Sequence, residues 1–170
     1  MISLELMSEK NSIDVYCFEK ENREYFERNL PPRPAAYFDS EGFKEITRKL
    51  LREQENHDVY MHLIRDVQGA MVGRINLSVL EDDRKTAELG YRIGENVTNL
   101  GYASEAVKLV LEKAFTTYGL HKIIAGTATD NLASQRVLLK NGFTFSKIIE
   151  NDFQMNNEWI HTAVFEIMNL

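Results

Sequence analysis

The stretch TAELGYRIGENVTNLGYASEA, residues 86–106, changes its pattern twice within a short length of chain. Thr86 to Gly94 is predicted to be a β-strand, because it follows the polar turn Glu81 to Lys85 and is bounded by turn residues. Glu95 to Ser104 is a loop that contains Gly101. A strongly amphipathic helix follows, with apolar residues at three- and four-residue steps until Gly119 stops it. The stretch therefore predicts a strand, a loop and a helix in direct succession.

The chain downstream of this unit repeats the alternation of strand and helix. Lys122 to Ala128 is β-branched and apolar, which indicates a buried strand. Because a helix joins the strands on either side of it, we expect those two strands to pair in parallel. Three further elements complete this half: a helix from Asp130 or Asn131 to Asn141-Gly142, and strands at Phe143 to Ile149 and Glu158 to Met168.

The chain upstream is predicted to hold a short strand, two helices and two more strands. Residues 2–6 alternate weakly. Ser8 is the expected cap of a first helix that turns Ile13, Tyr16, Cys17 and Phe18, and then Tyr25 and Phe26, inward. Asp39 or Ser40 is the expected cap of a second helix, which runs to about Gln54. Strands are expected from Val59 to Ile64 and from Met71 to Val79, with a turn at Asp66 to Gly69.

These elements predict an α/β fold, or more narrowly an α+β fold with a mixed sheet of parallel and antiparallel strands. We expect about seven strands and about four helices, with an antiparallel N-terminal meander and a parallel pair around the central helix. The chain has 170 residues, which favours a single domain spanning 1–170.

Composition excludes several classes of protein. Hydrophobic residues make up 44%, which is too many for a disordered chain. The single cysteine, Cys17, excludes a disulfide framework and a cysteine zinc cluster. The formal net charge of −6 argues against nonspecific binding to nucleic acid. No apolar run is long enough for a signal sequence or a membrane span, so we expect a soluble cytoplasmic protein.

The loop before the central helix is a candidate anion site. The first N–H groups of a helix lack acceptors and carry the positive end of the helix dipole. Main-chain amides there can hold a diphosphate without lysines, and Gly101 lets an anion approach the backbone. The same loop can equally be an ordinary turn. It is neither a P-loop nor a dinucleotide fingerprint, because the required Lys and spaced glycines are absent.

The start of the next helix carries a second candidate pair, Asn131 and Ser134. They lie one helical turn apart and share a face. Ordinary capping, with Asp130 or Asn131 as the N-cap, explains the same residues.

Taken in order, these segments resemble the GNAT superfamily of acetyl-CoA-dependent N-acetyltransferases, and more narrowly its RimJ/RimL-type branch. The resemblance is carried by Glu88-Leu-Gly-Tyr-Arg-Ile-Gly, by Gly101-Tyr-Ala-Ser-Glu-Ala and by the Asn-x-x-Ser-x-Arg of Asn131, Ser134 and Arg136. Gly142-Phe143 completes it. The family's phosphate loop falls on Thr98, Gly101 and Ala103. Thr98 departs from the usual Gln or Arg, which leaves the contacts to backbone amides.

The resemblance implies acetyl-CoA as co-substrate and no metal. The residues that it implies in contact with acetyl-CoA are Tyr91, Arg92, Ile93, Asn99, Leu100, Gly101, Tyr102, Ala103, Ser104, Asn131, Ser134 and Arg136. For Arg136, a structural ion pair is an equal alternative. The four histidines have no metal-like spacing, although His161 is a candidate for facing the acceptor.

The chemistry needs a base for the amine and an acid for the departing thiolate. Glu88 is the candidate base, with an exposed residue or an ion-pair partner as the alternative reading. Ser134 is the candidate acid, because the segment from Asn131 to Phe143 that contains it has no Tyr for that role.

The resemblance implies transfer of acetyl to a primary amine, with a protein N-terminal α-amine, as in ribosomal proteins, as the favoured acceptor. A small amine such as a polyamine, amino acid or antibiotic is the main alternative. A non-catalytic acyl-CoA sensor is an alternative of another class. A homodimer is a further expectation. Acceptor choice should come from the first two helices and the last hairpin, with Tyr37 and Phe38 either shaping the acceptor pocket or packing in the core.

Overall fold

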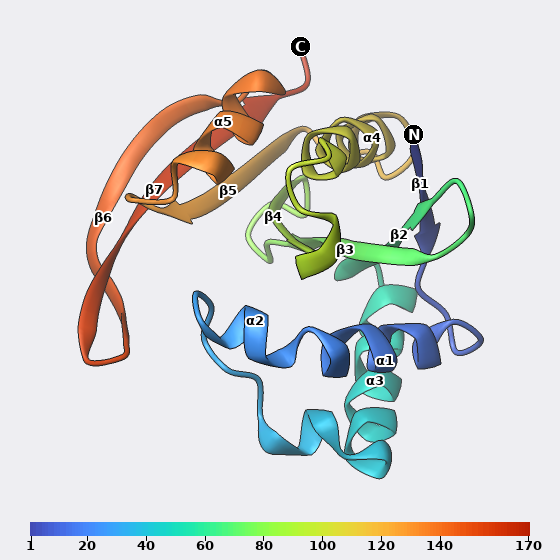
Figure 1. Cartoon of the computed structure of the whole chain (residues 1–170). Coiled ribbons are helices and arrows are strands. Elements are labelled where there is room, and N and C mark those ends of the chain that lie inside the picture. Colours follow the sequence, from blue (N-terminus) through green and yellow to red (C-terminus); the bar gives the residue numbers. More distant parts are fainter.

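The computed structural model describes residues 1–170 and contains one seven-stranded sheet in the order β1-β2-β3-β4-β5-β7-β6 (Figure 1). All neighbouring strands are antiparallel except β4 and β5, which are parallel. The prediction of a mixed sheet with one parallel pair is confirmed. The strands are β1 (Ile2–Leu6), β2 (Val59–Asp66), β3 (Met71–Val79), β4 (Thr86–Ile93), β5 (Lys122–Ala128), β6 (Thr144–Met155) and β7 (Glu158–Met168).

Helices cover both faces of the sheet. Figure 1 shows α4 on one face and α1, α2 and α3 on the other. The helices are α1 (Ser12–Glu21), α2 (Arg23–Glu27), α3 (Ser40–Glu55), α4 (Tyr102–Thr116) and α5 (Leu132–Lys140), with short 3-10 turns η1 (Ala35–Phe38) and η2 (Glu95–Val97). No helix has both the length and the apolar character that crossing a membrane requires.

The main core lies between α4 and the sheet. The small and branched side chains of α4 are fully buried there, which lets the helix lie close to the strands: Ala106, Val107, Val110 and Ala114. Gly73 on β3 is a point of close approach, because a Cβ there would lie 2.5 Å from the Arg92 carbonyl oxygen. A smaller cluster packs α1 and α3 against the other face.

The first helix differs from the prediction. It begins at Ser12 rather than after Ser8, and Ile13 and Cys17 are exposed. The buried residues of α1 are Val15, Phe18 and Glu19. The predicted inner face is thus right for Phe18 and Tyr16 and wrong for Ile13 and Cys17. Apolar content alone did not predict the burial of Glu19, whose carboxylate has partners on distant strands. The second helix starts as expected, with the Asp39 side chain accepting from the Gly42 N–H.

Strands β4 and β5 pair over only three residues, ending at Glu88 opposite Ile124. Beyond that point β4 stays paired to β3 through Ile93, and β5 stays paired to β7 through Ala128. The two facing edges are therefore unpaired at their carboxyl ends. Residues 94–101 lead from the end of β4 to helix α4, and residues 129–131 lead from the end of β5 to helix α5. Both helices therefore follow the carboxyl ends of the two strands that separate.

Candidate active site

The N-terminus of α4 has no side-chain cap. Its N-cap is Gly101, with the left-handed φ of 80°, and Asn99 two residues earlier has φ 62°. The first intrahelical bond runs from the Glu105 N–H to the Gly101 carbonyl. A Cβ added at Gly101 would meet nothing within 4 Å, so the space over this turn is open. The exposed N–H groups of residues 102–104 form the kind of site that binds an anion.

The helix N-terminus of α5 is built differently. Asn131 is its N-cap, and its side-chain oxygen accepts from the Ser134 N–H at 3.1 Å. The capping interpretation of Asn131 is therefore confirmed. Asn141 at the far end of α5 donates to the Ser104 carbonyl at 3.2 Å and so ties α5 to the first turn of α4. The first turn of α4 is therefore in contact with the C-terminal end of α5.

Tyr91 crosses the open end of the sheet. Its hydroxyl lies 3.0 Å from Ser134 Oγ, which links β4 to the first turn of α5. Burial raises the pKa of Tyr91, and the hydrogen bond to Ser134 opposes that rise. The phenol is therefore a neutral hydroxyl at physiological pH. The resemblance implied a contact of Tyr91 with acetyl-CoA, and it did not predict this side-chain contact with Ser134.

Glu88 lies on the opposite face of β4 from Tyr91. Side chains of a strand alternate between faces, so Glu88, Gly90 and Arg92 share one face. Glu88 is exposed and makes no side-chain hydrogen bond or ion pair within the chain. The ion-pair alternative for Glu88 is thus wrong. Arg136 is likewise exposed and has no ion pair, which removes the structural alternative suggested for it.

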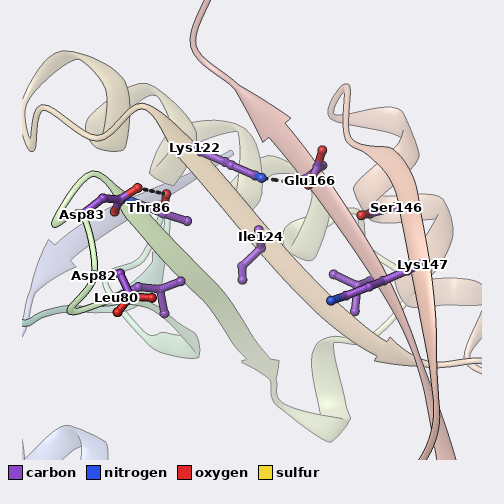
Figure 2. A pocket seen from close by; sticks show the side chains of 10 residues that line it. Leu80, Asp82, Asp83, Thr86, Lys122, Ile124, Ser146, Lys147 and Glu166 are labelled. Carbon is purple, nitrogen blue, oxygen red and sulfur yellow. Dashed lines mark hydrogen bonds and ion pairs between the residues drawn. The ribbon is translucent and has the colours of Figure 1, made fainter.

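A cavity of about 410 Å³ lies near the start of β4 and is lined by Thr86 but not by Glu88 (Figure 2). It lies between the β3–β4 turn and strands β5, β6 and β7, and it is lined by charges of both signs. Figure 2 shows Lys122 paired with Glu166 at 3.1 Å and Lys147 pointing into the space between the strands. Ile124, the cross-strand partner of Glu88, forms part of its wall.

Three arginines converge on one carboxylate at the other end of this face. Glu19 of α1 is 1% exposed and pairs with Arg33, Arg74 and Arg92 at 2.9, 3.0 and 3.2 Å. Arg74 also donates to the Tyr37 hydroxyl at 2.8 Å. Burial acts to raise the pKa of Glu19, but the arginines outweigh it and hold that pKa below its usual value.

This cluster was not predicted from the sequence. A signal was present in β3, where Arg74 is the one charged residue, and in α1, where Glu19 falls one turn after the buried Val15. His161 was a candidate for the acceptor side. Instead it shares the face of the buried Ala163 and Phe165, and its Nδ1 accepts from the Asn151 N–H at 3.0 Å.

The sheet separates at its one parallel pair, and an uncapped helix N-terminus follows the strand at this gap. This arrangement is the one expected of the acyl-CoA-dependent transferases that the sequence resembles. Residues 5–144 match the family model described as "Acetyltransferase (GNAT) domain". The chain belongs to this family and is an N-acetyltransferase of the GNAT type.

Relatives agree with this assignment. The "Probable N-acetyltransferase YjcK" of Bacillus subtilis (strain 168) is 31% identical over 153 residues, which cover 89% of this chain and 84% of that protein. Among solved structures, the ribosomal-protein-S5-alanine acetyltransferase from Vibrio fischeri has a TM-score of 0.91 at 19% identity, covering 99% of this chain and 93% of that one.

A spermidine N-acetyltransferase from Vibrio cholerae, solved with CoA and spermine, has a TM-score of 0.81 at 17% identity. The match covers 98% of this chain and 95% of that one. At these identities the two structures establish a shared fold.

Proposed function

We propose that this N-acetyltransferase moves acetyl from acetyl-CoA to the N-terminal α-amine of a protein or peptide. The observation that carries the proposal is the unpaired edge of β4 after Glu88, which leads to the uncapped N-terminus of α4. One end of this path offers strand-edge hydrogen bonds and the other offers an anion site. A molecule with an amide-bearing arm and a diphosphate, such as acetyl-CoA, matches both.

The residues of the path have distinct roles in this proposal. Main-chain groups of Tyr91 to Ile93 bind the pantetheine arm in the manner of an added strand. Amides between Asn99 and Ser104 bind the diphosphate. Arg136, which is exposed and unpaired on α5, is available for a further phosphate contact. A single acetyltransferase unit over residues 1–170 is supported by the one sheet that runs from Ile2 to Met168.

The transfer itself needs a neutral amine. Its nitrogen attacks the thioester carbonyl carbon, the new C–N bond forms, and the C–S bond breaks to release CoA thiolate. Glu88 takes the amine proton, directly or through water, because its carboxylate is exposed and without a partner in the chain. Ser134 delivers a proton to the thiolate and regains one from solvent, to which Glu88 releases the proton of the amine. Tyr91 holds the Ser134 hydroxyl in position.

An α-amine is the favoured acceptor on chemical grounds. Its ordinary pKa of about 8 leaves a larger neutral fraction at pH 7 than a lysine side chain, whose ordinary pKa is about 10.4. A weak base such as a carboxylate is then sufficient to remove the amine proton.

The test is release of free thiol from acetyl-CoA with a panel of amines. The panel holds short peptides with free N-termini, the same peptides with blocked N-termini and one lysine, and free small amines. We expect turnover with the free N-termini. Turnover confined to the lysine peptides or to small amines would contradict the α-amine assignment. Binding of acetyl-CoA without thiol release from any acceptor would favour the non-catalytic sensor.

The role of Glu88 has its own test. Glu88→Gln should remove the rise of kcat/KM with pH that reports the base, while the affinity for CoA stays the same. An unchanged pH–rate profile would show that another group takes the proton. Glu81→Gln, in the exposed turn after β3, is the matched control.

A further inference from the structure

The arginine cluster carries more positive charge than its one carboxylate neutralises. Arg33, Arg74 and Arg92 contact Glu19 and no other acidic side chain, so the group has a formal charge of +2. Their side chains are 26%, 6% and 17% exposed. Partly buried charge without a counter-ion is unfavourable. Binding of a further anion at the cluster is therefore electrostatically favourable.

Arg92 is the member of the cluster that makes the fewest hydrogen bonds. Arg33 contacts both oxygens of Glu19, through Nε and Nη2, and Arg74 contacts Glu19 and Tyr37. Arg92 makes one hydrogen bond, from Nη1 to Glu19 Oε2, out of the five N–H groups of a guanidinium. None of its other nitrogens is a buried atom without a partner, so its unused donors are open to solvent.

The surroundings of Arg92 favour a net positive potential. Burial lowers the pKa of Arg92 and the charge of Arg33 lowers it further, although the group stays protonated at neutral pH. Its guanidinium carbon lies 5.0 Å from the centre of the Phe26 ring, a cation–π contact that helps to hold the side chain in place. Arg74 is its cross-strand partner on β3, so two guanidinium groups lie side by side on this face.

The next position on this face of β4 is empty. Gly90 is exposed, and a Cβ there would meet nothing within 4 Å. Its cross-strand partner is Asn76, whose Oδ1 is the one buried side-chain polar atom without a hydrogen-bond partner. A missing side chain and a missing partner at the same register position indicate a place where another molecule binds.

This face of β4 therefore carries the carboxylate of Glu88, then open space at Gly90, then the guanidinium of Arg92. Glu88 and Arg92 are four residues apart, so their Cα atoms are separated by about 13 Å at about 3.3 Å per residue. Both side chains can reach over the gap at Gly90. An acceptor that spans it needs an amine near Glu88 and an anion one or two residue lengths away, that is about 3 to 7 Å.

We propose that the acceptor carries a carboxylate close to its amine and that Arg92, supported by Arg33, binds this carboxylate over Gly90. The proposal rests on the function proposed above, because it places the amine at Glu88. An acidic side chain in the first two residues of a peptide fits the span. The carboxylate of a free amino acid lies at the short end of it. Polyamines are disfavoured, because their second cationic group would face the guanidinium of Arg92.

The experiment compares peptides that differ only at the second residue. Ala-Glu-Ala-Ala, Ala-Gln-Ala-Ala and Ala-Lys-Ala-Ala are used as C-terminal amides, so the Glu side chain is the sole carboxylate. Free glutamate and spermidine complete the set. We expect kcat/KM for the Glu peptide to exceed that of the Gln peptide at least tenfold, and the Lys peptide to be poorer still. A preference for free glutamate over every peptide supports the carboxylate and assigns a small-molecule source.

Variants assign the preference to Arg92. In Arg92→Gln the ratio between the Glu and Gln peptides should fall to within about twofold of one, while Arg92→Lys should keep part of it. Arg65→Gln is the matched control, because Arg65 pairs with Glu5 and Asp14 elsewhere on the sheet. Thermal unfolding checks that each variant is folded. Equal rates for the Glu and Lys peptides, or an Arg92→Gln variant that keeps the preference, would overturn the proposal.

A binding measurement separates this proposal from the proposed function. Calorimetry with the complex of the protein and CoA, which cannot react, measures the affinity for the same peptides. If acetyl-CoA gives no thiol with any amine, the proposed function fails, yet tighter binding of the Glu peptide still supports the carboxylate site. If turnover occurs and neither rate nor affinity depends on the second residue, the carboxylate site alone fails.

Discussion

His62 on β2 is a buried histidine whose protonation should destabilise the fold. It is 1% exposed, with Nδ1 3.2 Å from the Ile75 carbonyl oxygen and Nε2 2.6 Å from the Tyr118 hydroxyl. A carbonyl oxygen only accepts, so Nδ1 carries the hydrogen and Nε2 accepts from Tyr118. Protonation of Nε2 breaks that arrangement and places a charge in the core under α4.

The magnitude follows from the pKa. Burial is the main cause that lowers the pKa of His62 from 6.5 to about 4. A group with a depressed folded pKa contributes stability that is complete above its unfolded pKa and is lost as pH falls toward the folded pKa. The window here is from about pH 6.5 down to about pH 4. The full gap corresponds to about 3 kcal/mol, of which about 2 kcal/mol is lost by pH 5.

Urea unfolding of the wild type and of His62→Gln between pH 7 and pH 5 measures this loss. The glutamine side chain does not titrate, and it can still donate and accept. Other groups titrate equally in both proteins, so the free energy of unfolding should fall by about 2 kcal/mol more in the wild type. At pH 7 the variant should be the less stable of the two. Parallel pH dependences would refute the reasoning, because they would show that His62 is not held neutral by the fold.

Three further predictions concern the site. Gly101→Val should strain the left-handed N-cap of α4 by about 1–2 kcal/mol and weaken CoA binding in calorimetry, whereas Gly69→Val, with φ 84° in a hairpin turn, should carry the strain without the loss of affinity. Glu19→Gln should lower the free energy of unfolding by about 3–5 kcal/mol, because it leaves three guanidinium charges uncompensated. Since the folded pKa of Glu19 is depressed, the deficit in urea unfolding should be full above about pH 4.5 and shrink below it. Ser134→Ala and Tyr91→Phe should lower kcat by similar factors, and the double variant should lower it no further in steady-state kinetics; an additive double variant would show that the two hydroxyls act independently.

Most of the fold was predictable because it depends on local patterns. The amphipathic period of the α4 segment, the turn at Asp66 to Gly69 and the alternation of strand and helix after Thr86 each specify an element from neighbouring residues. Parallel pairing of β4 and β5 then followed from the connection through α4. The inner face of α1 was only partly predictable, because a charged residue such as Glu19 is buried only where distant arginines reach it.

The residues of the candidate site also divide into those set by local sequence and those set by distant contacts. Gly101, Asn131 and Ser134 lie in motifs whose spacing is local, so the sequence could identify them. The contact between Tyr91 and Ser134 joins residues 43 apart, and the pairs of Glu19 with Arg74 and Arg92 join residues 55 and 73 apart. Such contacts depend on strand register, which places Arg74 opposite Arg92, and no local pattern gives that register.

The charge of the whole chain and the charge of the arginine cluster around Glu19 have opposite signs, and both bear on the choice of acceptor. The formal net charge is −6, and the four-residue cluster around Glu19 contributes +2, so the remaining residues carry −8. Fields from exposed charges are screened over about 8 Å at physiological ionic strength, while contacts at a half-buried guanidinium are screened much less. The acidic surface therefore favours approach of a cationic amine, and Arg92 acts only once the acceptor is in the gap at Gly90. A peptide with a free N-terminus and an acidic residue beside it meets both requirements, whereas a polyamine meets only the first.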